Sequence, residues 1–134
     1  ESTPKDAKIS GKKDSHANSM MEGYDSIATA LYKDDLAAAK KAAATLAQHD
    51  KKNAMARSAA NIAKSSSIAE ARKNFLTLSK SAIKAAKGDR GWNVMHCSMA
   101  FNNKGASWLQ KASEKKANNP YFGSEMPHCG RLTK

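Results

Sequence analysis

Valine occurs once in this chain of 134 residues, at Val94, and aromatic residues make up only 6% of it. A β-sheet is built mainly from β-branched and aromatic side chains, whereas small and unbranched side chains suit close contact between helices. The hydrophobic core must therefore consist mainly of Ala, Leu, Ile and Met. A chain of this length forms one domain with a single modest core, and we expect it to be all-α.

Four consecutive segments carry apolar residues at helical spacing. In the first, which begins at about residue 16, Met20, Tyr24, Ile27 and Leu31 lie on one face of a helix. The other three extend over about residues 36–49, 52–64 and 68–86. Four helices joined by short connections predict an antiparallel four-helix bundle.

Residues typical of helix ends stand between these segments. Asp34 and Asp35 precede the second helix, where either carboxylate can cap it. Ser67 followed by Glu70 has the spacing of a capping box and marks the start of the fourth helix. Gly88 is placed to end that helix in the left-handed conformation that glycine tolerates.

Composition divides the rest of the chain. Residues 1–15 combine charges and hydroxyls without periodicity and are predicted to be a flexible leader before a single domain, residues 16–134. Residues 89–134 hold both Trp and both Cys, and Gly and Asn interrupt them. We expect this C-terminal cap to be irregular apart from a helix around residues 106–116. Function tends to lie on such segments.

The chain is strongly basic, with a net charge of +11. Between Leu36 and Gly88 the only acidic residues are Asp50 and Glu70. This balance fits a solvated lysine-rich helix face, and it could also attract an acidic protein, an anionic membrane or nucleic acid. Arginine clusters and nucleic-acid-binding motifs are absent from the sequence, as are a phosphate-binding loop, a nucleophile elbow and a membrane-spanning apolar run. We therefore expect neither an enzyme nor a nucleic-acid-binding protein.

Soft donor atoms gather in two clusters of the C-terminal cap. The candidate metal ligands are Met95, His96, Cys97 and Met99 in the first cluster, and Met126, His128 and Cys129 in the second. Thiolate and thioether ligands suit copper, above all Cu(I). Zinc sites space their ligands differently and seldom use methionine, so zinc is the weaker candidate.

A disulfide between Cys97 and Cys129 explains the two cysteines equally well. In the chain-entropy model, closing a loop of this length stabilises the fold by roughly 3–4 kcal/mol. The methionines would then be core filler. The residues alone leave both interpretations open, with zinc or a reactive thiol as further alternatives, and the copper-bound and disulfide states could alternate because oxidation abolishes thiolate ligation.

The C-terminal motifs resemble those of an uncharacterised family of bacterial periplasmic domains. That family occurs alone or appended to adaptor subunits of heavy-metal efflux systems, chiefly for copper and silver. Its pattern is roughly C-P-M-A, then K-G-A-x-W-L, then N-P-Y-x-G-x-x-M-x-x-C-G. The chain supplies Cys97, Met99, Ala100, Lys104, Gly105, Ala106, Trp108 and Leu109, and then Asn119, Pro120, Tyr121, Gly123, Met126, Cys129 and Gly130. Ser98 replaces the usual Pro, and His96 and His128 are additions to the pattern.

The resemblance implies a periplasmic copper-binding protein that stores, buffers or delivers the metal. By position, Cys97, Met99, Met126 and Cys129 match the family's candidate soft-metal ligands. Since the chain opens with a polar stretch and without Met, we expect an exported protein whose signal peptide has been removed. The added histidines could allow Cu(II), or even a dinuclear electron-transfer centre. The expected partner is an acidic protein, such as an efflux component or a recipient cuproprotein.

Overall fold

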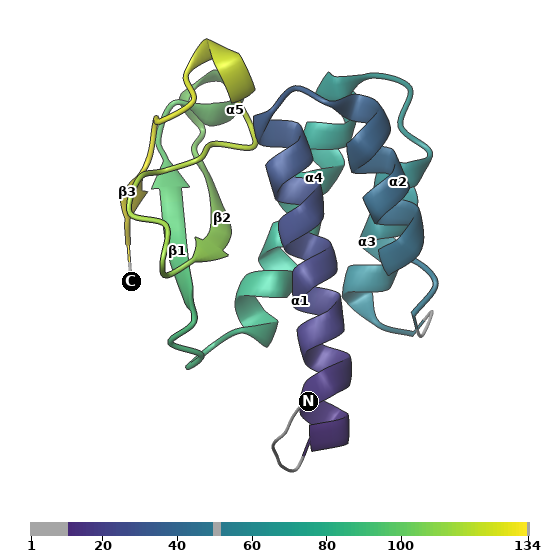
Figure 1. The fold of residues 1–134 in the computed structure, drawn as a ribbon. Helices are drawn as coiled ribbons and strands as arrows, with labels where there is room; N and C mark the ends of the chain where they lie inside the picture. Colours follow the sequence, from purple (N-terminus) through teal and green to yellow (C-terminus); the bar gives the residue numbers. More distant parts are fainter. Residues whose placement is uncertain (1–10, 50–51, 134) are drawn as a thin grey trace.

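The computed structural model describes residues 11–49 and 52–133, and the side chains from Ser19 onward in these ranges. The fold has two parts (Figure 1). Four helices form a bundle, and a small antiparallel sheet lies beside it. The prediction of an all-α domain with an irregular C-terminal cap is therefore wrong, because the fold is mixed α and β.

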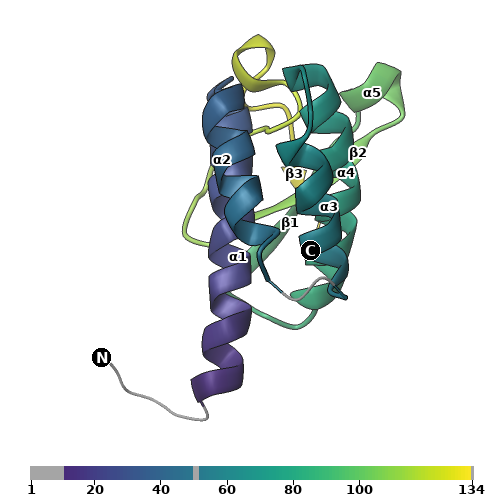
Figure 2. The same cartoon turned by 90° about the vertical axis from the view of Figure 1, so that its right-hand side faces the viewer.

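The four predicted helices are present. They are α1 (Gly11–Tyr32), α2 (Leu36–Leu46), α3 (Ala54–Ala63) and α4 (Ile68–Ala85). Helix α1 begins five residues before the predicted start, and residues 1–10 of the predicted leader lie outside the described residues. Consecutive helices pack against each other, and α4 also contacts α1 (Figures 1 and 2). Within the described part of the chain, none of the helices has the length and apolarity needed to cross a membrane.

The predicted end signals act largely as expected. The Asp35 carboxylate accepts a hydrogen bond from the Ala38 N–H at the start of α2. Ser67 caps α4 by accepting from the Glu70 N–H, although the Glu70 carboxylate reaches back to Ser66 rather than to Ser67. Gly88 follows α4 with a φ of +85°, which confirms the left-handed ending.

The C-terminal part contains strands that composition did not predict. They are β1 (Trp92–Cys97), β2 (Ala106–Lys111) and β3 (Arg131–Leu132), in the order β2-β1-β3 with antiparallel pairing. The helix expected around residues 106–116 is wrong, since β2 occupies its first half. The physical reason is local: the only valine and both tryptophans lie in β1 and β2, so the residues that favour strands are concentrated where the sheet forms.

A buried tyrosine joins the bundle to the sheet. The Tyr24 hydroxyl of α1 accepts a hydrogen bond from the Leu109 N–H of β2 at 3.0 Å and shares another with Ser79 of α4 at 2.7 Å. Burial raises the pKa of this hydroxyl well above its usual value. Seen from the side, the sheet lies behind the bundle (Figure 2). Strand β2 is the sheet's main contact with α4.

Candidate thiol and metal site

After β2 the chain returns across the sheet before it forms β3 (Figure 1). Side chains and backbone of β2 hold this returning segment: Gln110 donates to the Lys116 carbonyl, and the Tyr121 hydroxyl donates to the Ser107 carbonyl. A Cβ added at Gly130 would lie 2.6 Å from the Trp108 ring. Glycine is needed there because the segment lies directly on the indole. The segment is thereby fixed against the sheet.

This packing brings the two cysteines together. Cys97 is the last residue of β1, pairs with Ala106 and is completely buried. Cys129 lies in the returning segment, just before Gly130, and is partly buried. Their Sγ atoms are 2.6 Å apart, about 0.6 Å more than the length of a disulfide bond. The two clusters of the sequence therefore meet through their thiols.

Met99 lies beside this thiol pair, which we define as the Sγ atoms of Cys97 and Cys129. Its backbone N–H donates to the Cys129 sulfur, and its side chain is 48% exposed. The hydrogen bond that the Cys129 thiol donates to the Cys97 sulfur, together with partial burial, raises the pKa of Cys129, while the Met99 N–H opposes this rise. At neutral pH the Cys129 sulfur is therefore held mainly as a thiol while Cys97 is reduced.

The loop between β1 and β2 has an unusual backbone. Phe101, Asn102 and Asn103 have φ values of +54°, +57° and +68°, which form a left-handed turn labelled α5 (Ala100–Asn103). Such a conformation costs roughly 1–2 kcal/mol per residue, and a bulky residue such as Phe101 adopts it rarely. The Phe101 ring packs edge-on against Tyr121 at 5.4 Å, which helps to hold the turn. Strain is thus stored two residues from Met99.

Neither histidine of the two clusters shares this arrangement. Side chains alternate along β1, so His96 points away from the face that carries Met95 and Cys97. Its Nδ1 is 2.8 Å from the Ser107 hydroxyl. His128 donates from Nδ1 to the Ala117 carbonyl at 2.8 Å, and its ring lies near Tyr32. Both imidazoles are oriented by groups other than the thiols.

The other two methionines of the clusters, Met95 and Met126, lie in different surroundings. Met95 is 6% exposed and pairs with Trp108 across the sheet, as expected of a core residue. Met126 is half-buried, and its carbonyl accepts from the Cys129 N–H at 3.2 Å. Among the described residues no group of three or more His, Cys, Asp or Glu side chains is arranged to hold a metal ion. The donors brought together are two thiols, with a thioether close by in the chain.

Asn119 fixes the position of Cys129. This side chain is completely buried. Its Oδ1 accepts from the backbone N–H groups of Tyr121 and Phe122, at 2.7 and 3.1 Å, and its Nδ2 donates to the Cys129 carbonyl at 2.7 Å. The amide side chain therefore shapes the turn at Pro120 and ties it to the cysteine ten residues later.

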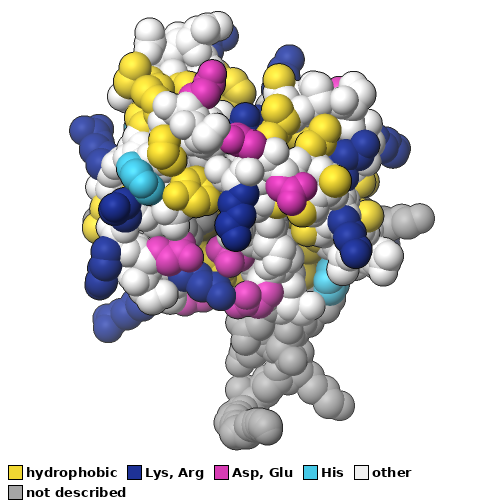
Figure 3. Space-filling model, turned by 45° about the horizontal axis from the view of Figure 1, so that its top comes forward, with side chains coloured by type: hydrophobic (Ala, Val, Ile, Leu, Met, Phe, Trp, Pro, Cys, Tyr) yellow, Lys and Arg dark blue, Asp and Glu magenta, His cyan; other side chains and the backbone are white. Residues whose placement is uncertain are grey.

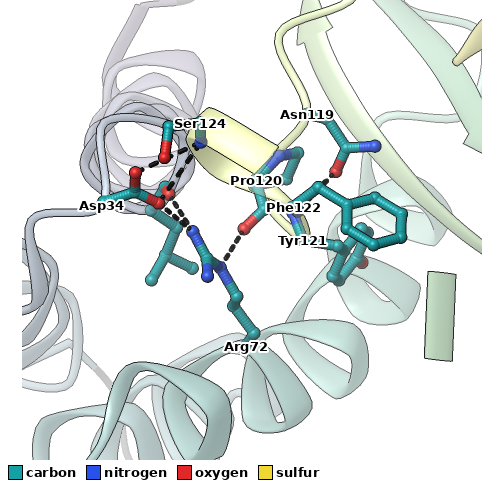
Figure 4. Close-up of polar contacts among 8 residues, drawn as sticks. Asp34, Arg72, Asn119, Pro120, Tyr121, Phe122 and Ser124 are labelled. Carbon is teal, nitrogen blue, oxygen red and sulfur yellow. Dashed lines mark hydrogen bonds and ion pairs between the residues drawn. The ribbon is translucent and has the colours of Figure 1, made fainter. Parts of the chain in front are cut away.

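A second polar cluster ties the same segment to the bundle (Figure 4). Arg72 of α4 donates to the carbonyls of Pro120 and Leu31 and to the Asp34 carboxylate, at 2.8, 2.7 and 2.8 Å. Asp34 also accepts from the Ser124 N–H at 3.2 Å. A Cβ added at Gly123 would overlap Asp34 and Arg72, so only glycine fits beside them. This cluster joins the loop after α1, helix α4 and the returning segment.

Asp34 gives the fold a dependence on pH. Hydrogen bonds from Ser124 and Arg72 lower the pKa of its carboxyl below the usual 3.8. A lowered pKa means that the ionised form stabilises the folded state above about pH 4, and that this stability is lost as the pH falls through the folded-state pKa. We expect an Asp34→Asn variant to lose less stability on acidification than the unmodified chain.

Urea unfolding between about pH 6 and pH 2 measures this difference. Glu70, whose pKa is also lowered by hydrogen bonds from Ser66, remains in both proteins and supplies an acid-sensitive background. The two stability curves should converge as the pH falls below 4. Parallel curves over the whole range would show that Asp34 does not couple its ionisation to folding.

The sequence indicated some of these residues and missed others. The meeting of Cys97 and Cys129 agrees with both interpretations of the sequence, a shared metal ion and a disulfide. The contribution of Arg72 was not expected. Its position beside the buried Ala71, at the border of the apolar face of α4, is the signal that could have identified it as a partly buried cation in need of partners.

Comparison with known proteins gives no further assignment of this site. No family model matches the chain, and neither the curated proteins nor the solved structures include a significant match to it.

Proposed function

We propose that this chain is a copper-binding protein that stores, buffers or delivers Cu(I) through Cys97 and Cys129. The observation that carries the proposal is the meeting of two thiols from segments 32 residues apart. Two thiolates form a soft donor set, which favours Cu(I) over oxygen-seeking metals. The meeting of the two cysteines supports a site whose donors are of the kind that Cu(I) favours.

Met99 is the third ligand that the geometry supports best. It lies two residues after Cys97, its N–H contacts the Cys129 sulfur and its side chain is exposed. Two thiolates that bind one metal ion at about 2.3 Å each have sulfurs roughly 4 Å apart, so binding requires the thiols to separate. Cys129 is the cysteine that can turn, because it lies in a loop rather than in a strand. Cu(II) would need an imidazole as well, and both histidines would have to give up their present hydrogen bonds.

The setting of this activity is also part of the proposal. The resemblance of the C-terminal motifs supports a periplasmic location and a role beside heavy-metal efflux. The net charge of +11 supports an acidic partner. On the face in Figure 3, Lys and Arg side chains are spread widely, with acidic side chains between them. On that face the positive charge is therefore not confined to one basic patch.

A second candidate is a structural or protein-interaction module whose two cysteines form a disulfide. The specific observation in its favour is the Sγ–Sγ distance of 2.6 Å, which is closer to a disulfide than to a metal-bridged pair. In this case the covalent link would hold the returning segment on the sheet. Stability would then depend on oxidation and not on copper.

Titration of the reduced protein with Cu(I), without oxygen and in competition with a chromophoric chelator, separates the two candidates. A copper protein removes Cu(I) from the chelator, and a Cys97→Ser/Cys129→Ser variant does not. Met99→Leu should bind more weakly than the unmodified chain, because it lacks the thioether. Ser98→Ala, an exposed neighbour, is the matched control and should bind normally.

His96→Ala and His128→Ala define the ligand set further. We expect both to keep the Cu(I) affinity, since the structure orients each imidazole toward other groups. A loss of affinity in either would add that histidine to the ligands. Affinity as weak in the unmodified chain as in the double cysteine variant would contradict copper binding and leave the disulfide module.

A further inference from the structure

The two sulfurs of the thiol pair differ in their access to solvent. Cys97 is completely buried at the end of strand β1. This strand is paired with β2 at Cys97, through Ala106, and with both β2 and β3 at residues 95 and 96. Cys129 is partly exposed and lies in the returning segment outside the strands. An external reagent can therefore reach one sulfur and not the other. In thiol–disulfide exchange, access decides which sulfur is attacked.

The backbone around Cys129 allows this side chain to move. Its N–H is bonded to the Met126 carbonyl at 3.2 Å, and its carbonyl accepts from Asn119. Neither bond involves the sulfur itself, whose contacts are the Met99 N–H and the Cys97 sulfur; turning outward exchanges these contacts for solvent while the backbone stays in place. The Cys97 sulfur, by contrast, cannot turn to solvent without disturbing the packing beneath the sheet.

We propose that Cys129 is a site of reversible S-thiolation by low-molecular-weight thiols, and that Cys97 is its resolving cysteine. The thiolate of the small molecule attacks Cys129 Sγ of the oxidised chain and forms a mixed disulfide there. The Cys97–Cys129 bond breaks, and its electron pair leaves on Cys97 Sγ, which then takes a proton from solvent. In the reverse step the Cys97 thiolate attacks Cys129 Sγ, closes the internal disulfide and releases the small thiol.

The same roles apply to oxidation. A reduced chain reacts with a low-molecular-weight disulfide at Cys129, and one small thiol is released. The Cys97 thiolate then attacks Cys129 Sγ in the mixed disulfide and releases the second small thiol. Two protein thiols are oxidised and one external disulfide is reduced to two thiols, so electrons balance. The net charge of +11 favours reagents that are anionic, as glutathione is. This inference goes beyond copper binding, because it involves no metal.

Glutathione is the probe for the test. The oxidised chain is mixed with reduced glutathione, quenched with acid at short times and mapped by peptide mass spectrometry. We expect the mixed disulfide on Cys129. In a second measurement, reduced Cys97→Ser and Cys129→Ser variants react with oxidised glutathione. The variant that keeps Cys129 should react at least about tenfold faster.

The same two variants in concentrated urea provide the control. Their rates of reaction with oxidised glutathione should become equal when the chain unfolds. Circular dichroism confirms that each variant is folded in buffer. Glutathione on Cys97 in the unmodified chain, or equal rates in the two folded variants, overturns the proposal. A chain that forms no internal disulfide with oxidised glutathione overturns it too. Failure to bind Cu(I) would leave these results unchanged, so the two proposals fail separately.

Discussion

Replacement of Asn119 by Ala is expected to lower the free energy of unfolding by about 3–5 kcal/mol. The completely buried amide bonds two backbone N–H groups and one carbonyl. Without it, the buried Tyr121 N–H and the part-buried Phe122 N–H and Cys129 carbonyl lose their partner, and each unsatisfied buried group costs about 1–3 kcal/mol. The loss should also release Cys129, whose carbonyl is the third partner. Urea unfolding measures the stability, and alkylation of Cys129 in the folded state measures the release.

Asn118→Ala is the matched control for this change. The Asn118 side chain makes one long contact, 3.5 Å to the Glu114 carboxylate, and its backbone N–H bond to Gln110 is unaffected by the substitution. We expect a change below about 0.5 kcal/mol, as for most surface substitutions. Equal losses in the two variants would show that the amide network of Asn119 does not organise the segment.

The second large effect is expected for Arg72→Met, at about 2–4 kcal/mol. The guanidinium satisfies the carbonyls of Leu31 and Pro120, and Met preserves much of the aliphatic stem. The expected loss arises mainly from these two charge-assisted bonds, since a charged donor contributes more than a neutral one. Its measurement is again the free energy of unfolding in urea.

Lys73→Met tests whether the effect belongs to the bonds or to the charge. Lys73 is the exposed neighbour of Arg72 on α4, so its replacement removes the same charge without the two carbonyl contacts. It should change stability by less than about 0.5 kcal/mol. Combination of Arg72→Met with Asp34→Asn then measures the coupling between the two side chains. A loss in Lys73→Met as large as in Arg72→Met would assign the effect to charge alone.

The helices could be predicted because their signals are local. The apolar faces, the Asp35 and Ser67 caps and the Gly88 ending all lie within a few residues of the structure they specify. The sheet could not be predicted from average composition. Trp92, Val94 and Trp108 are few in the whole chain but are concentrated in two short strands. The pairing of Met95 with Trp108, which completes the strand pattern, is a tertiary contact.

For the candidate site, the sequence indicated the cysteines and not the orientation of their neighbours. Cys97 and Cys129 are the only cysteines of the chain, and their sulfurs meet. His96 was grouped with Cys97 because the two are adjacent, but adjacent residues of a strand face opposite sides. Recognition of β1 as a strand would have separated them. The position of Arg72 at the border of an apolar helix face could have indicated a partly buried cation, but its partners lie 38 to 48 residues away and no local pattern identifies them.

The hydroxyl of Tyr24 has a consequence for how the molecule assembles. Contacts between consecutive helices close short loops, whereas the Tyr24–Leu109 bond spans 85 residues and the Asp34–Ser124 bond spans 90. Distant pairings must overcome a larger entropy of chain closure before they contribute any stability, and they slow folding accordingly. We therefore expect the bundle to form first on its own contacts, and docking of the sheet to complete the native state. The two thiols come from segments 32 residues apart within the C-terminal part, so their meeting requires that part to form and does not require its docking on the bundle.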